Sequence, residues 1–182
     1  DNLAAEVAAG NYSKVIPVEY PKVGEQPSPV KIGVVNIQSG ETKWMNIPGD
    51  PANNYLPRME WSGADELIVQ QLNRKQNESK ILRVDAATGK TKLIHSEKDP
   101  AWVEVMVPGE NTYDIDFKHP MHWLAGGKEF LWSSEKGGWR QLYKISTDGT
   151  KEVLVTPGRY DAISLKGYDE KSGLVYFIAS PE

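Results

Sequence analysis

The side chains of this 182-residue chain that could take part in chemistry include two adjacent serines, two closely spaced histidines and one acidic cluster. Ser133 or Ser134 could act as a nucleophile if the fold brought a histidine base next to it. The sequence contains no Gly-x-Ser-x-Gly elbow, however, and no context around these serines indicates an oxyanion site. We therefore predict no catalytic residue in this chain.

Metal ligands are the second class of side chains to consider. His119 and His122 are three positions apart, a spacing that points them to opposite faces of a strand, so they do not form a metal pair. Glu110, Asp114 and Asp116 carry oxygen ligands, but their spacing is not that of a calcium loop, and a solvated strand edge is favoured. Cysteine is absent from the sequence, which excludes thiol ligands and disulfides. We predict no metal site and no cofactor.

One polar turn is a candidate for ligand binding. Asn73, Arg74 and Asn77 lie in a polar stretch between two strand-like runs. Asn side chains commonly bond to the backbone of turns. Capping of the turn and hydrogen bonds between neighbouring repeats are therefore favoured over ligand binding.

The overall composition limits the classes of function. A net charge of −4 and a pI of about 5.5 leave no basic excess for binding phosphates, so no nucleic-acid partner is predicted. No apolar run approaches the ~18 residues that a membrane-spanning helix needs. The 39% hydrophobic fraction, with six tryptophans, is sufficient for a folded core.

The first 29 residues form an N-terminal segment that differs from the rest. Residues 1–10 predict a short helix that Asn2 caps and Gly10 ends. Four prolines between positions 17 and 29 predict an extended connection, because each proline removes a backbone donor.

Residues 30–182 read as short strands separated by turns rich in Gly, Asp and Asn. The strands group into a half unit at 30–47, full units at about 54–96 and 114–156, and a half unit at 160–179. Repeated units of four short strands are typical of propeller blades. The predicted fold is all-β, a partial β-propeller of about three four-stranded antiparallel blades.

The tryptophans fit this repeat. Six tryptophans could line a sugar-binding surface, but Trp61, Trp123 and Trp132 recur at corresponding strand positions. This recurrence favours packing between blades.

Several long segments resemble the propeller domain of bacterial dipeptidyl peptidase IV, a serine exopeptidase of the prolyl oligopeptidase family. These segments are 20–25, 55–61, 70–78, 97–103 and 130–143. The resemblance implies an eight-bladed propeller that caps an α/β-hydrolase domain in a longer protein, with the active site in the cavity between them. It also implies release of N-terminal dipeptides from peptide substrates and a periplasmic or secreted location.

None of the family's catalytic or amine-binding residues has a matching residue in this chain. The amine-binding Glu pair would precede the Tyr20-Pro21-Lys22 segment, where only isolated Glu6 and Glu19 occur. The family's extended-substrate contacts fall at 104–113, which makes Met106 and Tyr113 the substrate-binding candidates, with an inter-blade loop as the alternative.

We therefore expect a non-catalytic, inactive propeller portion that walls the substrate cavity and gates peptide access. The missing hydrolase domain and remaining blades would be its partners. A non-enzymatic propeller that binds a protein or glycan is the alternative. Exposed edges of an incomplete propeller also predict self-association.

Overall fold

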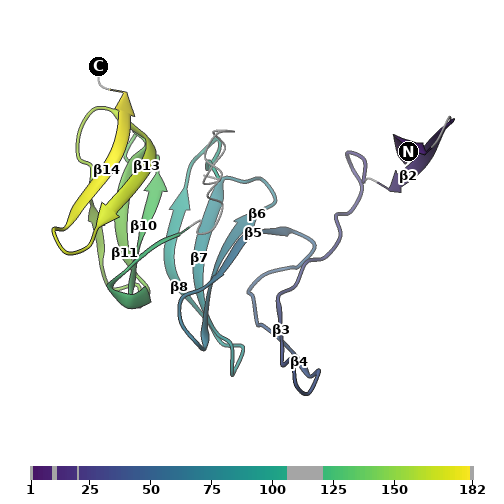
Figure 1. Ribbon diagram of the computed structural model, residues 1–182, viewed down its shortest axis with the longest axis horizontal. Helices are drawn as coiled ribbons and strands as arrows, with labels where there is room; N and C mark the ends of the chain where they lie inside the picture. The colour runs from purple at the N-terminus through teal and green to yellow at the C-terminus, as the bar shows by residue number, and fades with distance from the viewer. Residues whose placement is uncertain (1, 10–11, 20, 106–120, 181–182) are drawn as a thin grey trace.

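The computed structural model describes residues 2–9, 12–19, 21–105 and 121–180. Strands provide nearly all of its regular structure, and the described residues include one short 3-10 turn, η1 (Ala125–Gly127). The sheets stand face to face in a row, from the β3–β4 hairpin to the β13–β14 hairpin (Figure 1). This arrangement confirms an all-β partial propeller.

Two complete blades form the centre of the row, and each is an antiparallel sheet whose strands follow chain order. The first blade contains β5 (Asn54–Trp61), β6 (Glu66–Asn73), β7 (Glu78–Asp85) and β8 (Thr91–Lys98). The second contains β9 (His122–Leu124), β10 (Glu129–Ser134), β11 (Gln141–Ser146) and β12 (Glu152–Leu154).

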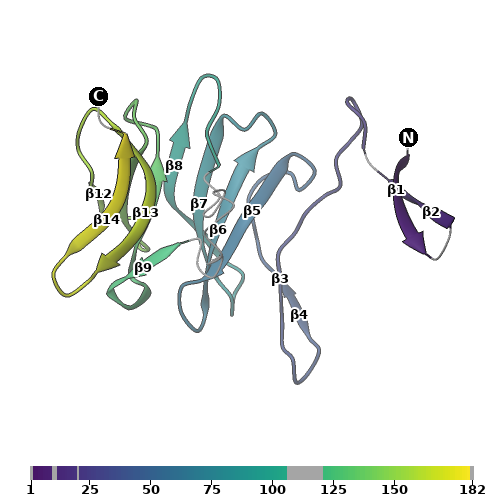
Figure 2. The ribbon, with the colours of Figure 1, turned by 45° about the horizontal axis from the view of Figure 1, so that its top comes forward.

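Two-stranded sheets flank the complete blades, as the sequence predicted (Figure 2). They are β3 (Gly33–Val35) with β4 (Thr42–Trp44), and β13 (Asp161–Asp169) with β14 (Leu174–Ser180). The first of these pairs is shorter than predicted.

The predicted helix at residues 1–10 is wrong. Strand β1 (Asn2–Ala9) instead pairs antiparallel with β2 (Tyr12–Glu19), from Asn2 opposite Glu19 to Ala9 opposite Tyr12. A helix of this length is marginal without packing, and the intervening Gly10-Asn11 pair is of a type favoured in hairpins. Because β2 runs to Glu19, the extended connection also begins later than predicted.

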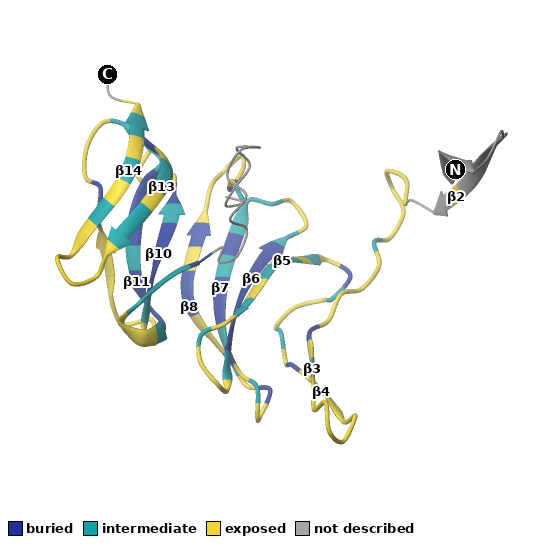
Figure 3. Ribbon diagram, viewed as in Figure 1, coloured by how far each residue is buried: buried dark blue, intermediate teal, exposed yellow. Residues whose placement is uncertain are grey.

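The core lies between the sheets, and the strands of the two complete blades carry most of the buried apolar residues (Figure 3). On β6, Leu67 and Val69 face β3–β4, whereas Ile68 faces the second blade. Successive strand residues point to opposite faces, so a continuous apolar run serves both interfaces. The larger cluster joins the two complete blades through Ile68, Ile81, Ile94, Met121, Phe130, Trp132, Tyr143 and Ile145.

Candidate functional site

One end of the first blade brings together the turn after β6 and the segment after β8. Asp99 N donates to Asn77 O at 3.1 Å, and Val103 N donates to Gln76 O at 2.8 Å. These backbone bonds fix the chain just before residues 106–120. Two segments of the described chain, residues 73–78 and 99–105, therefore lie together and form a rim.

Asn73 caps the β6–β7 turn, as the sequence predicted. Its Oδ1 accepts hydrogen bonds from the backbone N–H groups of Asn77 and Glu78, both at 3.1 Å. Arg74 Nη1 donates to the Tyr55 hydroxyl at 2.9 Å, and its guanidinium lies 5.6 Å from the centre of that ring. Tyr55 belongs to the same blade, so these bonds of Asn73 and Arg74 lie within the first blade.

Trp102 is the exposed aromatic residue of this rim, with half of its surface open to solvent. Asp99 Oδ1 accepts from the N–H groups of Ala101 and Trp102, and these bonds lower the pKa of Asp99. The Trp102 indole N–H donates to Glu104 Oε2 at 3.1 Å. The rim thus presents an aromatic ring and charged groups, which suit stacking and polar contacts with a peptide.

The other sequence candidates fall in different places. Met106 and Tyr113 lie outside the described residues, as do Glu110, Asp114, Asp116 and His119. His122 lies on β9 and meets the Tyr168 ring edge-on at 6.4 Å. Ser134 is 3% exposed, and its hydroxyl donates to Glu97 Oε2 at 2.7 Å, so it serves the blade interface.

The tryptophan prediction is confirmed for Trp132 and Trp123, which belong to or pack against the cluster between the complete blades. Trp61 occupies the position on β5 that Trp123 occupies on β9, yet half of its surface is exposed. For Trp61 the prediction is wrong. The short β3–β4 hairpin covers the β6 and β7 part of that face and leaves Trp61 open.

The interface between the complete blades has polar contacts at both sheet edges. At the β5 edge, Glu60 accepts from Met121 N at 3.0 Å and from Trp123 Nε1 at 3.2 Å. Arg58 lies 5.4 Å from the centre of the Trp132 ring, and burial lowers the pKa of Arg58 against the opposing charge of Glu60.

At the β8 edge a buried network centres on Glu97. Its carboxylate accepts from Trp132 Nε1 and from the Ser134 hydroxyl, and it lies 2.8 Å from His95 Nε2. Burial alone would raise the pKa of Glu97, but the hydrogen bonds from His95, Ser134 and Trp132 outweigh it and lower the pKa. Glu97 therefore remains ionised inside the interface.

Sequence analysis did not identify this network. The available signal was the spacing of His95 and Glu97, which places both side chains on one face of a strand. Their partners on β10 and β12 are 35 to 57 positions away in the chain, and only the stacking of the blades brings them close.

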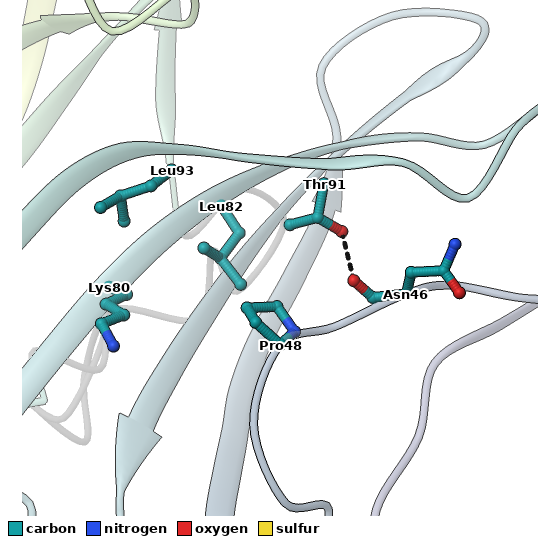
Figure 4. Close-up of a pocket in the computed structure, with 6 residues that line it drawn as sticks. All are labelled: Asn46, Pro48, Lys80, Leu82, Thr91 and Leu93. Atoms are coloured by element: carbon teal, nitrogen blue, oxygen red, sulfur yellow. Dashed lines mark hydrogen bonds between the residues drawn. The ribbon is translucent and has the colours of Figure 1, made fainter.

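A groove of about 260 Å³ lies beside the first blade, where the segment after β4 crosses β7 and β8 (Figure 4). Thr91 Oγ1 donates to Asn46 O at 2.8 Å across its floor. Its one cationic lining residue, Lys80, already pairs with Glu78 at 3.2 Å. The groove therefore indicates no particular ligand.

The described residues show neither a metal cluster nor a membrane-spanning helix. They contain no group of three or more His, Cys, Asp or Glu side chains arranged to hold a metal ion. They also contain no helix with the length and apolar character needed to cross a membrane.

Comparison with known proteins places these blades in a family. A curated relative from Emericella nidulans, described as "Probable dipeptidyl peptidase 4", is 28% identical over 177 residues, which cover 93% of this chain and 22% of the relative. Dipeptidyl peptidase 4 from Trichophyton equinum is 25% identical over 175 residues, with 93% and 21% covered. The chain thus spans about a fifth of the length of these relatives.

A solved structure and a family model extend the comparison. The crystal structure of Porphyromonas gingivalis dipeptidyl peptidase 4 matches with a TM-score of 0.76 and 29% identity, over 98% of this chain and 24% of that one. The model of the dipeptidyl peptidase IV N-terminal region matches residues 2–182. This chain, with its consecutive propeller blades, therefore belongs to the dipeptidyl peptidase IV N-terminal region family.

Proposed function

We propose that this chain is the non-catalytic propeller portion of a dipeptidyl peptidase IV-like serine peptidase. In the longer protein it walls the substrate cavity and restricts entry to peptides, while a separate α/β-hydrolase domain releases N-terminal dipeptides. The observation that carries the proposal is the family match over residues 2–182, together with a sequence that has no Gly-x-Ser-x-Gly elbow. The same relationship leads us to propose a periplasmic or secreted location, which cell fractionation tests.

The rim around Trp102 supports a role in peptide access. Its half-exposed ring, the adjacent Glu104 and Arg74 of the β6–β7 turn can contact the part of a peptide that extends beyond the first two residues. A short dipeptidyl substrate does not have that part. Loss of the rim side chain should therefore affect long substrates more than short ones.

The test uses the full-length protein and two substrates, a short Gly-Pro-type chromogenic substrate and a peptide of about ten residues. We expect dipeptide release from both substrates, and Trp102→Ala should lower kcat/KM for the long peptide several-fold and leave the short substrate unchanged. Trp44→Ala, which alters an exposed tryptophan on β4, is the control and should change neither. Absence of dipeptide release would contradict the peptidase proposal and favour a non-enzymatic binding propeller. Equal effects of Trp102→Ala on both substrates would contradict the gating role.

A further inference from the structure

His95 lies buried between two carboxylates that come from two different blades. Its Nε2 is 2.8 Å from Glu97 Oε1 on its own strand β8, and its Nδ1 is 2.9 Å from Glu152 Oε2 on β12. The side chain of His95 is only 4% exposed. The imidazole therefore joins the edge strands of the two complete blades.

The hydrogen-bonding capacity of the ring defines the protonation state that this geometry requires. A neutral imidazole has one N–H donor and one nitrogen lone pair, whereas an ionised carboxylate only accepts hydrogen bonds. Two carboxylate contacts at 2.8 and 2.9 Å therefore need both ring nitrogens to carry hydrogen. The geometry of the closed interface is therefore complementary to an imidazolium at this position.

The groups around His95 keep both carboxylates in place. Glu97 also accepts from Trp132 and Ser134 on β10, which lowers its pKa and keeps it ionised. Glu152 pairs with Lys136 of the β10–β11 turn.

Lys136 Nζ in turn lies 4.2 Å from the centre of the Tyr143 ring on β11. Burial, with the charges of Glu152 and Glu97, raises the pKa of Tyr143, so this phenol is neutral at physiological pH. Of the groups facing the contact, the imidazole is the type whose charge changes near neutral pH.

We propose that His95 is a proton-dependent latch that closes the β8–β12 edge of the blade interface. When the pH rises and the ring loses a proton, a nitrogen lone pair faces the Glu152 carboxylate, and the edge opens. The opposite edge behaves differently, because Glu60 there accepts from the Met121 N–H and the Trp123 indole and faces the charge of Arg58, and none of these groups changes charge near neutral pH. Only the β8–β12 edge therefore opens when the pH rises. This opening requires no catalytic activity.

The first test is NMR spectroscopy of the chain labelled with ¹⁵N-histidine. The sequence has three histidines, and His95→Gln identifies the resonances of His95. In spectra recorded between about pH 6 and about pH 8 we expect both ring nitrogens of His95 to carry hydrogen while the edge is closed, and one of them to lose it where the edge opens. A neutral ring throughout this range overturns the proposal.

Hydrogen exchange of the backbone amides measures the opening itself. After correction for intrinsic exchange, the β12 amides should open at least about tenfold more at pH 8 than at pH 6, while the β9 amides change within about twofold. The midpoint of the β12 change should coincide with the titration of the ring. If the opening of β12 does not follow the loss of the ring proton, the latch proposal is wrong.

Two substitutions separate the latch from general effects of charge. The Glu152→Gln carboxamide can donate to the lone pair of a neutral ring, so this variant should lose the pH dependence of β12 opening. Lys136→Gln removes the other ion pair of Glu152 but keeps the His95 contact, so it should retain the dependence, as should His122→Gln on β9. If Glu152→Gln keeps the wild-type dependence, the proposal is wrong. If a variant fails to fold, the NMR measurement of His95 protonation in the wild-type chain decides whether the proposal holds.

Discussion

Glu60 and Glu97 have the same role at opposite edges of one blade: each accepts an indole N–H from the next blade. Trp123 donates to Glu60, and Trp132 donates to Glu97. A carboxylate removed from water needs donors to replace its hydration, and bonds to an ionised acceptor are stronger than neutral ones. The blades therefore require specific acceptors as well as apolar contact.

Replacing Glu60 tests this requirement. Glu60→Ala leaves the buried Met121 N–H and the Trp123 indole without an acceptor, so we expect a loss of about 1–3 kcal/mol in the free energy of unfolding. Urea denaturation followed by tryptophan fluorescence measures it. Glu66→Ala, which breaks a partly exposed pair with Arg83, should cost less than about 1 kcal/mol. Equal losses in the two variants would contradict a special role for Glu60.

The lowered pKa of Glu97 predicts acid sensitivity. Because the folded pKa lies below the ordinary value of 4.5, the contribution of Glu97 is complete above that value. It is lost as the pH falls through the lowered folded pKa. The urea midpoint of the wild type should therefore fall more steeply below about pH 4.5 than that of Glu97→Gln. Glu41→Gln, at an exposed turn, is the control, and parallel curves for wild type and Glu97→Gln would refute the prediction.

At the scale of elements, short apolar runs bounded by turns predicted the strands of the two complete blades, because the central strands bury side chains on both faces. Strand β6 illustrates this, with Leu67 and Val69 in one cluster and Ile68 in the other. The pattern failed at β1, where an alanine-rich run is compatible with helix or strand and pairing with β2 decides the outcome. Local sequence was sufficient where burial was strong and insufficient where pairing alone defined the element.

The turn after β9 packs on the preceding blade, and this contact is testable. Gly127 has φ +88°, and a Cβ there would overlap the Ser62 carbonyl oxygen of the β5–β6 turn. Gly138 has φ +87° but open space around it. Both alanine variants should lose about 1 kcal/mol from backbone strain, and Gly127→Ala should lose a further ~1–3 kcal/mol from the clash. Thermal and urea unfolding of the two variants measure the difference, and equal losses would show that the turns do not pack closely.

At the scale of the whole molecule, apolar side chains line the outward face of the last hairpin. Leu174, Tyr176 and Ile178 alternate along β14 and are 53%, 55% and 48% exposed. Exposed apolar faces of this kind are typical of interaction surfaces.

We accordingly expect the isolated chain to self-associate through β14. Light scattering after size exclusion should show a mass that increases with concentration, and Tyr176→Lys with Ile178→Lys should shift it toward the monomer. Val35→Lys, at an equally exposed position on β3, should leave association unchanged. A monomer at every concentration would refute this expectation.

The sequence by itself determined the strands of the blades, the repeat of the blades and the absence of a nucleophile elbow, because these depend on local periodicity and on motifs that are continuous in the chain. Only the tertiary structure decided which polar residues meet. The partners of His95 lie on the same strand and on β12 of the next blade, 57 positions away. Stacking of one blade on another creates that contact, and it also explains why Trp123 is covered while the corresponding Trp61 is open. Burial between blades is a property of neighbouring sheets, and no local pattern in one strand encodes it.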